Sequence, residues 1–333
     1  MGAFDGRSVL VTGADGFIGS HLVERLVAQG ARVRALVLYN SLGRWGWLEE
    51  PHVSQDLLDS VEFFPGDIRD PGRVRKAAAG QDVVFHLSSL IAIPYSYVAP
   101  HSYVETNVTG ALNLMEACRD AGVSRVVHTS TSEVYGSARY VPIDEAHPLQ
   151  GQSPYSASKI GADMMAQSYH RSFELPVVTV RPFNTFGPRQ SARAVIPTIL
   201  SQLLSGRTQI RLGALAPTRD FNFVDDIVEG FLLAARCDRA VGEVVQLGTG
   251  AEVSIGDLVR LAADVAGCSV EVSEEQQRVR PAGSEVDRLC CDASRAREWM
   301  GWVPKVDLRE GLARTASWMR QHLDLYKADV YNV

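Results

Sequence analysis

Two residues four positions apart, Tyr155 and Lys159, have the types and the spacing to remove a proton from an alcohol. Ser153 and Pro154 directly before them are typical of a helix start, so both side chains are expected on one face of a helix. A free tyrosine has a pKa of about 10 and is a poor base at neutral pH. A lysine ammonium beside it favours the phenolate and lowers that pKa. The pair therefore predicts acid–base chemistry on a hydroxyl group, although the same spacing also occurs in plain surface pairs.

A second group of polar residues lies upstream, in the stretch Thr129–Gly136 (Thr-Ser-Thr-Ser-Glu-Val-Tyr-Gly). This stretch directly follows a short β-branched run that is expected to form a buried strand. Open α/β sheets bind their ligands at the carboxyl ends of their strands. The hydroxyls of Thr131 and Ser132 and the carboxylate of Glu133 are therefore predicted to lie at a ligand site. For Glu133 the alternative is a solvated loop acid.

A glycine-rich turn near the amino terminus predicts a site for a dinucleotide. Val9–Thr12 reads as a buried strand, and Gly13, Gly16 and Gly19 follow it at the start of an expected helix. Glycines at such a turn let backbone N–H groups approach a pyrophosphate, and the helix dipole adds to the attraction. The spacing is G-x-x-G-x-x-G rather than the G-x-G-x-x-G of the dehydrogenase fingerprint, so a purely structural turn remains the alternative.

The residues after the second and third strands bear on which dinucleotide binds. An acid at the end of the second strand (32–38) suits NAD, and an arginine suits NADP, but this chain has neither there. Asn40 or Ser41 could hydrogen-bond the ribose, and Arg44 leaves NADP open. After the third strand, residues 66–70 either contact the adenine or form a turn in which the last of them, an aspartate, caps the next helix.

Alternating strands and helices predict a Rossmann-type, doubly wound parallel α/β sheet with a smaller, interleaved C-terminal substrate domain. The expected strands of the first half cover 9–12, 32–38, 61–64, 83–87, 126–128 and 177–180, and its helices cover 71–80, 104–121 and 153–173. His86 and His128 fall on these strands, with rings expected to be hydrogen-bonded internally. The following stretch 181–189 reads as a loop because of its Pro and Gly content.

The second half continues with mixed elements. Helices are expected near 194–205, up to 235, at 254–266, 292–300 and 308–323, and strands at 208–212, 244–247 and 269–273. The predicted dinucleotide domain comprises 1–182 with 220–250, and the substrate domain comprises 183–219 with 251–333.

Composition narrows the class of protein. The chain has 333 residues, of which 46% are hydrophobic and 22% charged, and its net charge of −6 argues against a nucleic-acid partner. Neither a membrane-spanning run nor a signal-peptide pattern is present. The number of cysteines is odd, and C-x-x-C spacing is lacking, so we expect a reduced, cytoplasmic protein without disulfides or a metal site. Cys290 and Cys291 are expected in a strand, facing opposite ways.

From Gly13 to the loop at Arg280, the chain resembles the extended short-chain dehydrogenase/reductase family of nucleotide-sugar epimerases and dehydratases. Its Thr-Ser-Glu triplet (131–133) is similar to that of the 4,6-dehydratases. The stretches 91–97, 181–193 and 331–333 resemble one subgroup, the dehydratases that feed legionaminic-acid-type sugars and act on nucleotide-linked N-acetylglucosamine. The resemblance implies NAD as cofactor, with NADP open, and a UDP- or GDP-linked sugar as substrate.

The resemblance also implies roles for single residues. Tyr155 would deprotonate the C4 hydroxyl with Lys159 beside it, and Thr131 would hydrogen-bond the same oxygen. Glu133 would remove the C5 proton, and Asn107 would support the lysine through water. The implied cofactor contacts are Gly13, Gly16, Phe17, Ile18, Gly19, Asn40, Asp67, Ile68, Leu87, Ser88, Tyr155 and Lys159. The implied substrate contacts are Ser89, Thr131, Asn184, Arg193, Arg219 and Arg280.

One residue of the triplet departs from the pattern of the thymidine-linked glucose dehydratases. They carry an aspartic acid that protonates the leaving C6 hydroxyl, whereas this chain has Ser132, as in the guanosine-linked mannose dehydratases. Serine is too weak an acid for that task, so Glu133 is expected to deliver the proton that it took from C5. The expected product is a 4-keto-6-deoxy sugar.

Other interpretations stay open at this point. The chain could be a C4 epimerase, which returns the hydride to C4, or a non-catalytic binding protein on the same fold. Arg219 and Arg280 could be ordinary surface ion-pair partners. Apolar residues on helices 104–121 and 153–173, including Met164 and Met165, could belong to the core. They could also form a helix–helix homodimer contact, which is common in the family.

Overall fold

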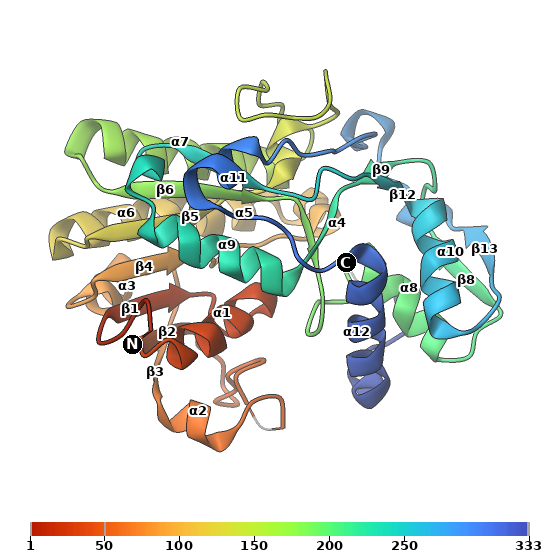
Figure 1. The fold of residues 1–333 in the computed structure, drawn as a ribbon, viewed down its shortest axis with the longest axis horizontal. Coiled ribbons are helices and arrows are strands. Elements are labelled where there is room, and N and C mark those ends of the chain that lie inside the picture. The colour runs from red at the N-terminus through yellow and green to blue at the C-terminus, as the bar shows by residue number, and fades with distance from the viewer. Residues whose placement is uncertain (1, 50, 332–333) are drawn as a thin grey trace.

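A seven-stranded parallel sheet lies at the centre of the molecule (Figure 1), in a computed structural model that describes residues 2–49 and 51–331. The strand order is β11-β6-β5-β4-β1-β2-β3, and all neighbours run parallel. The predicted fold class is confirmed. The strands are β1 (Ser8–Thr12), β2 (Arg32–Leu38), β3 (Val61–Gly66), β4 (Val83–His86), β5 (Arg125–Thr129), β6 (Val177–Pro182) and β11 (Val244–Leu247).

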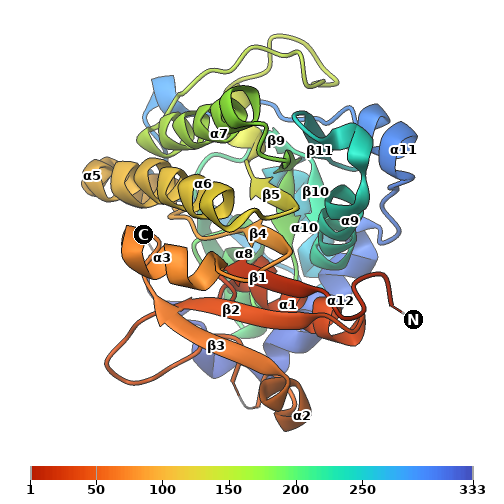
Figure 2. The same cartoon turned by 90° about the vertical axis from the view of Figure 1, so that its left-hand side faces the viewer.

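Helices cover both faces of this sheet, which explains why its central strands are apolar on both sides. Figure 2 shows α3, α6 and α7 on one side and α1 and α9 on the other. Two separate groups of buried side chains fill the space between the sheet and these helices. The helices are α1 (Phe17–Ala28), α3 (Pro71–Ala78), α6 (Gly110–Ala121), α7 (Pro154–Phe173), α9 (Val224–Arg236) and α12 (Leu308–Gln321), with the short α2 (Gln55–Asp59), α4 (Ile93–Val98) and α5 (Pro100–Tyr103) between strands.

One long helix differs from its prediction. The helix expected over 104–121 begins as a π-helix at Val104–Thr109 and continues as α6 only from Gly110. A π-turn inserts one extra residue into a helix and is frequent at functional sites. The apolar periodicity of the sequence does not reveal it, because Asn107 is the one buried residue of the π segment and the buried apolar positions begin in α6.

The later part of the chain forms small sheets and helices beside the large sheet. The paired strands are β7 (Asn184–Phe186) with β10 (Phe221–Phe223), β8 (Gln209–Leu212) with β13 (Glu271–Glu274), and β9 (Thr218–Arg219) with β12 (Val253–Ser254). The helices are α8 (Val195–Leu204), α10 (Ile255–Ala266) and α11 (Ser294–Met300).

Two predictions for this part are wrong. Residues 181–189 are not all loop, because β6 extends to Pro182 and β7 follows at Asn184. Cys290 and Cys291 do not lie in a strand, and both residues are buried. Cys291 makes an isolated bridge with Ile143.

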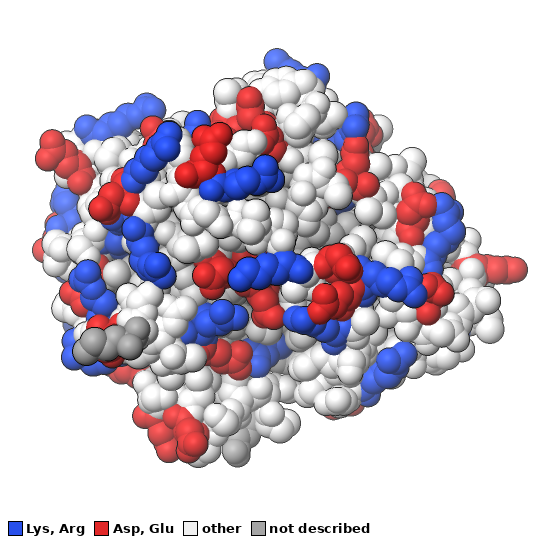
Figure 3. All heavy atoms as spheres, in the orientation of Figure 1, with Lys and Arg blue, Asp and Glu red and all other residues white. Residues whose placement is uncertain are grey.

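The surface gives two further findings. Basic and acidic side chains alternate over the described part of the face shown in Figure 3, without a large field of one sign. Within residues 2–49 and 51–331, no helix has the length and apolar character needed to cross a membrane.

Candidate active site

Tyr155 and Lys159 lie on the first turns of α7, where the helix meets the end of β5. Ser153 caps the helix and exchanges hydrogen bonds with Ser156, and Pro154 occupies the first helical position. Both chemically active side chains are buried. The Lys159 Nζ atom donates to the main-chain oxygen of Thr129 at 2.6 Å, which ties the helix to the strand end.

The electrostatics of the tyrosine differ from the sequence expectation. Burial raises the pKa of Tyr155 above its ordinary value, a hydrogen bond with Thr131 lowers it, and the charge of Glu133 raises it further. The expected lowering is therefore not found in the protein alone, because the cost of burying a phenolate is the dominant effect. Burial also lowers the pKa of Lys159 to about 8. These interactions bring Thr131, Glu133 and Tyr155 together in one pocket.

A short 3₁₀ turn presents the triplet. Thr131 precedes the turn Ser132–Tyr135, and its hydroxyl accepts from the Glu133 backbone N–H at 3.3 Å. Gly136 ends the turn with a φ of 62°, a value that L side chains rarely adopt. The Ser132 side chain is buried, and only 9% of Glu133 is exposed, so Glu133 is not a solvated loop acid.

Two arginines flank the Glu133 carboxylate. Arg219 Nε lies 4.0 Å from Glu133 Oε1, and Arg280 Nη1 lies 3.9 Å from Glu133 Oε2. Arg219 is 6% exposed, which sets it apart from an ordinary surface ion-pair partner. Arg280 Nη1 is buried and has no hydrogen-bond partner among the described residues. Two guanidinium groups with spare donors suit a substrate diphosphate.

Sequence reasoning missed a second carboxylate in this cluster. Glu285 Oε1 lies 3.5 Å from Arg219 Nη2 and 3.7 Å from Arg280 Nη1. The two acids and two arginines thus balance each other in charge. An acid five positions after Arg280, beyond a Pro-Ala-Gly turn, is the signal that could have found it.

Asn107 lies within the π-turn and joins three segments around the pocket. Its Oδ1 accepts from Ser89 Oγ at 3.0 Å and from Leu90 N at 2.8 Å. Its Nδ2 donates to Leu90 O and, at 2.9 Å, to Ser158 Oγ beside Lys159. The asparagine therefore fixes the segment after β4, which carries the predicted substrate contact Ser89, against α7.

The glycine turn between β1 and α1 has the features of a pyrophosphate site. Gly13 has a φ of 67°, and a Cβ atom there would lie 2.9 Å from Ser88 N. Gly16 precedes α1 without a side-chain cap, and the first turn has no acidic residue. Unpaired N–H groups at an uncapped helix start attract a phosphate. Phe17 and Ile18 are the first two residues of that helix, and Gly19 packs against the turn.

The segment that follows β4 lies beside this turn. The backbone N–H groups of Leu87 and Ser88 both donate to Thr12 Oγ1, at 3.1 and 3.2 Å. Leu87 and Ser88, predicted to contact the cofactor, therefore lie directly beside the glycine turn.

The residues predicted to contact the adenosine part of the cofactor already pair with other groups of the protein. Asn40 uses its side chain within its own turn, donating to Leu38 O and Arg44 O and accepting from Leu42 N and Arg44 N. Arg44 pairs with Glu49 at 3.0 Å.

Asp67 and Ile68 follow β3. Asp67 pairs with Arg69 and lines a recess of about 470 Å³ together with Glu105. Ile68 is buried against Gly110 of α6. Asp70 caps α3 by accepting from the next two backbone N–H groups, so the capping interpretation of residues 66–70 is confirmed.

Two predicted substrate contacts lie outside the charge cluster. Asn184 is on β7, and its buried Oδ1 atom lacks a partner among the described residues. Arg193 is exposed, and its Nε donates to Ser191 Oγ at 3.1 Å. Burial raises the pKa of Tyr103 to about 12, and the charge of Arg193 opposes this shift; the Tyr103 ring lies 6.2 Å from that of Tyr155, centroid to centroid.

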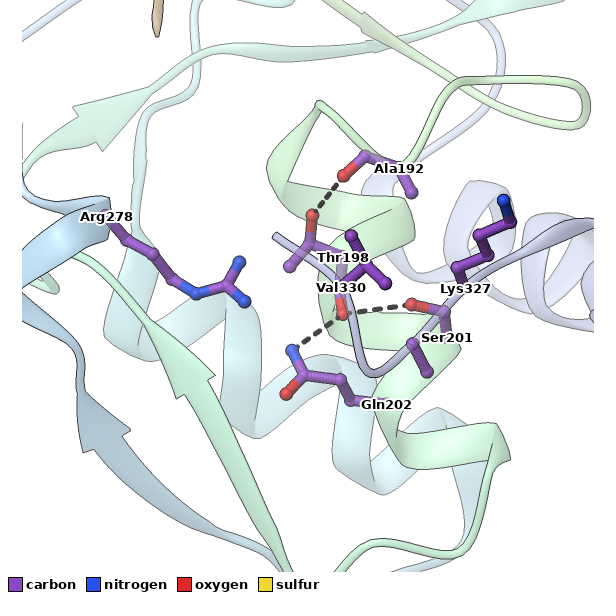
Figure 4. A pocket seen from close by; sticks show the side chains of 8 residues that line it. Ala192, Thr198, Ser201, Gln202, Arg278, Lys327 and Val330 are labelled. Carbon is purple, nitrogen blue, oxygen red and sulfur yellow. Dashed lines mark hydrogen bonds between the residues drawn. The ribbon is translucent and has the colours of Figure 1, made fainter. Parts of the chain in front are cut away.

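Residues 327–330 lie beside α8. Figure 4 shows Arg278 and Lys327 on opposite sides of α8, around a small cavity. The Arg278 guanidinium lies 4.6 Å from the ring centroid of Tyr331. Of the terminal stretch 331–333 that carries part of the resemblance, residues 332 and 333 lie outside the described residues.

Two further expectations concern buried groups. His86 Nδ1 and His128 Nδ1 are 3.0 Å apart, so the expected internal hydrogen bonding of these rings is confirmed. Within the described residues, His, Cys, Asp and Glu side chains nowhere gather in a group of three that could hold a metal ion.

Comparisons with known proteins agree with this geometry. A family model described as GDP-mannose 4,6 dehydratase matches residues 10–315. A UDP-glucose 4-epimerase from Mycolicibacterium smegmatis is 37% identical, over 93% of this chain and 98% of that protein. A dTDP-glucose 4,6-dehydratase from Streptomyces griseus is 36% identical, over 94% of both chains. The structure of DesIV, the dTDP-glucose 4,6-dehydratase from Streptomyces venezuelae with NAD and TYD bound, superimposes with a TM-score of 0.83, at 32% identity over 96% of this chain and 99% of that one.

Proposed function

Since the chain belongs to the GDP-mannose 4,6 dehydratase family, we propose that it is a nucleotide-sugar 4,6-dehydratase that uses NAD. Its relatives are nucleotide-sugar 4,6-dehydratases and 4-epimerases, so both reactions have to be weighed. They share oxidation at C4. They differ in whether a second base then removes the proton at C5.

The observation that carries the proposal is the position of Glu133. Its carboxylate is buried at the end of β5, and its charge acts on the Tyr155 phenol. A base for C4 and a base for C5 thus share one pocket, as dehydration requires. The ion pairs of Glu133 with Arg219 and Arg280 are long, at 4.0 and 3.9 Å, and leave the carboxylate free to act.

The glycine turn supports NAD as the cofactor. Gly13, Gly16 and Gly19 would hold its pyrophosphate at the uncapped start of α1, and Lys159 would hold the nicotinamide ribose. Bound NAD would supply a hydride acceptor for C4 and a hydride donor for C6, so the overall reaction would be redox-neutral. NAD is present in the DesIV structure, and NADP stays open for this chain because Arg44 lies in the loop after β2.

In the proposed mechanism, different residues of the chain carry out the separate acid–base steps. Thr131 hydrogen-bonds the C4 oxygen, and Tyr155 takes the C4 hydroxyl proton, with Lys159 stabilising the phenolate. The C4 ketone acidifies the C5 hydrogen, because the carbanion becomes an enolate, and Glu133 removes that proton. Ser132 is too weak an acid to protonate the leaving group, so Glu133 delivers the proton to the C6 oxygen. Each such step contributes about 10²–10⁴-fold when the geometry holds.

We propose a UDP-linked N-acetylglucosamine as substrate, with the GDP-linked sugar as the other possibility. Arg219 and Arg280 would bind the diphosphate in place of their present partner Glu285, and Asn184 and Arg193 would contact the adjoining groups. Support for this sugar comes from the sequence resemblance to the subgroup that feeds legionaminic-acid-type sugars.

A C4 epimerase is the second candidate. The observation that favours it is the 37% identity to a UDP-glucose 4-epimerase. An epimerase needs Tyr155 and Lys159 but no base at C5. Under this alternative Glu133 would only balance the charge of the two arginines.

Product analysis separates the two candidates. The holoenzyme is incubated with UDP-N-acetylglucosamine and with GDP- and dTDP-linked hexoses, and the products are examined by mass spectrometry and NMR. Loss of water from the sugar supports the dehydratase. An unchanged mass with inversion at C4 means an epimerase, and no turnover on any sugar of the panel favours a non-catalytic protein.

A further inference from the structure

A fully buried ion pair lies behind the pocket and takes no part in the mechanism above. Asp163 follows Lys159 by one turn of α7, and Arg181 lies on β6 with 1% of its surface exposed. Arg181 Nη2 is 2.8 Å from Asp163 Oδ2. Removing both charges from water is costly, and such a pair is weak evidence for stability. Its other contacts therefore indicate what it does.

These contacts converge on the two ends of the turn that carries the triplet. At the near end, Ser130 Oγ donates to Asp163 Oδ2 at 2.6 Å and accepts from Arg181 Nε at 3.1 Å. At the far end, Arg181 Nη1 donates to the Tyr135 hydroxyl at 2.5 Å, and its guanidinium lies 4.7 Å from the centroid of that ring. The segment between Ser130 and Tyr135 consists of the triplet and one valine.

We propose that Asp163 and Arg181 are positioning residues for the reaction: they hold the Ser130–Tyr135 segment, and with it Thr131 and Glu133, against α7. The inference rests on the proposed function, since it names the residues that set the geometry of that site. Helix α7 carries Tyr155 and Lys159, so the ion pair fixes the C5 base relative to the C4 base. A misplacement of about 1 Å can cost about 10²-fold in rate.

The charge of Asp163 also acts on the catalytic lysine. Burial lowers the pKa of Lys159 to about 8, and the Asp163 carboxylate opposes this shift. His128 Nε2 lies 3.1 Å from Asp163 Oδ1 and links the pair to the next strand. The titratable and charged groups that act on Asp163 are His128 on β5, Arg181 on β6, and Lys159 and Tyr155 on α7, while His86 on β4 contacts His128 and Tyr135 contacts Arg181.

The first experiment uses Tyr135→Phe, which removes one hydroxyl and no charge. We expect kcat for water loss to fall about tenfold with KM within a factor of two, because the triplet is displaced while the arginines still bind the diphosphate. Hydrogen exchange of amides 130–136 should become faster, without a change in β11. Unchanged exchange in that segment would overturn the inference, and this readout needs no turnover.

The second experiment uses Asp163→Asn, with Asp226→Asn as the matched control. Asp226 is also a buried helical carboxylate, but it accepts from Lys305 N and Val306 N, away from the pocket. In Asp163→Asn the alkaline limb of kcat/KM should move to lower pH by about one unit, because the lysine loses a neighbouring anion. The control should lower the melting temperature and leave the limb in place.

The outcomes separate the inference from the proposed function. Suppose that the wild-type holoenzyme converts a nucleotide sugar, that Tyr135→Phe keeps the wild-type kcat, and that kcat/KM of Asp163→Asn falls at the same alkaline pH as in the wild type. The inference then fails and the proposed function stands. If the wild type converts none of the panel but amides 130–136 exchange faster in Tyr135→Phe, the positioning of this segment stands and the proposed function fails. If Asp163→Asn does not fold, Tyr135→Phe decides.

Discussion

Among single residues, Glu133 is the one on which the proposed dehydration depends. Glu133→Gln keeps the size of the side chain but removes the base, so the rate of water loss should fall by about 10²–10⁴-fold. Mass spectrometry of the product over time measures this rate. Glu285→Gln is the matched control, because it removes one carboxylate from the same arginine cluster and leaves the base. Near wild-type loss of the C6 oxygen in Glu133→Gln would refute the dehydration mechanism.

Lys159 sets the expected pH dependence. Burial lowers its pKa to about 8, so the ammonium loses its proton as the pH rises through this value. The charge that favours the Tyr155 phenolate is lost at the same time, and kcat/KM should fall above about pH 8. Lys159→Arg keeps its charge to much higher pH and, where it remains active, should shift this limb upward. A limb that stays in place in this variant would mean that another group titrates.

The same pKa shift predicts a change in stability. The unfolded chain holds the Lys159 proton up to an ordinary pKa of 10.5, whereas the folded chain releases it near 8. Between these values the unfolded state binds more protons, so the contribution of Lys159 to the free energy of unfolding rises with pH. Urea unfolding of the wild type and Lys159→Met at pH 7 and pH 10 measures this difference.

Residue types and spacing alone indicated part of the pocket. Thr131, Glu133, Tyr155 and Lys159 were singled out from the sequence, and the structure brings them together, while their roles stay predictions. The sequence could not predict the direction of the Tyr155 pKa shift, because that depends on how deeply α7 is buried. Nor could it predict Glu285, whose contact with the arginines depends on the path of a loop.

At the scale of elements, the turn between β1 and α1 is the proposed site for the cofactor pyrophosphate. Gly13→Ala places a Cβ atom 2.9 Å from Ser88 N at a φ of 67°, so the folded state should lose about 1–2 kcal/mol and NAD should bind more weakly. Thermal unfolding with and without NAD measures both effects. Gly6→Ala is the matched control, since Gly6 has a φ of 68° but open space around it. Equal losses in the two variants would mean that the contact with Ser88 is unimportant.

The π-turn at Val104–Thr109 gives a second prediction for an element. Asn107→Asp keeps the acceptor for Leu90 N but loses the donors to Leu90 O and Ser158 Oγ. We expect a loss of about 1–3 kcal/mol in unfolding free energy and a lower kcat. Asn113→Asp on α6 removes two donors to Ile68 O and Arg69 O and serves as control. It should lose similar stability and keep kcat; an equal fall of kcat in both would count against a special role for the π-turn.

Periodicity predicted most elements, and it failed where local rules do not decide. The apolar pattern of the helix over 104–121 comes from α6, whereas Val104–Thr109 bury only Asn107, so the π-turn left no mark in the pattern. The stretch 181–189 reads as loop because Pro and Gly are frequent, yet β7 forms there by pairing with β10, a partner distant in sequence. Residues 290 and 291 show the opposite error, since β-branched and apolar neighbours did not produce a strand.

For the whole molecule, we expect a homodimer through α6 and α7, as the sequence resemblance implies. Met164 on α7 is 40% exposed, so it is not a core residue, and Val104 and Phe173 are 52% and 50% exposed. Met164→Glu should therefore produce monomers in sedimentation velocity or light scattering, because a charge in an apolar contact is costly. Leu42→Glu, at a residue 80% exposed in the loop after β2, is the control and should leave assembly unchanged. A monomeric wild type would contradict the prediction.

The fold class was predictable from alternation alone, since strand–helix–strand units have few stable arrangements. The sequence did not reveal which strands of the second half of the chain pair with each other. The two small sheets β9–β12 and β8–β13 each join segments that are far apart in the chain. The proposed division into two interleaved domains stays a prediction.

The edge strand β11 has a consequence for how the protein is made. A nascent chain that has just released β6 from the ribosome has six strands of the large sheet, but one flank of β6 still lacks its partner. An unpaired flank of this kind can recruit foreign strands. Until Val244–Leu247 leave the ribosome and pair with β6, the growing polypeptide is exposed to aggregation. A chaperone would be of most use during this interval.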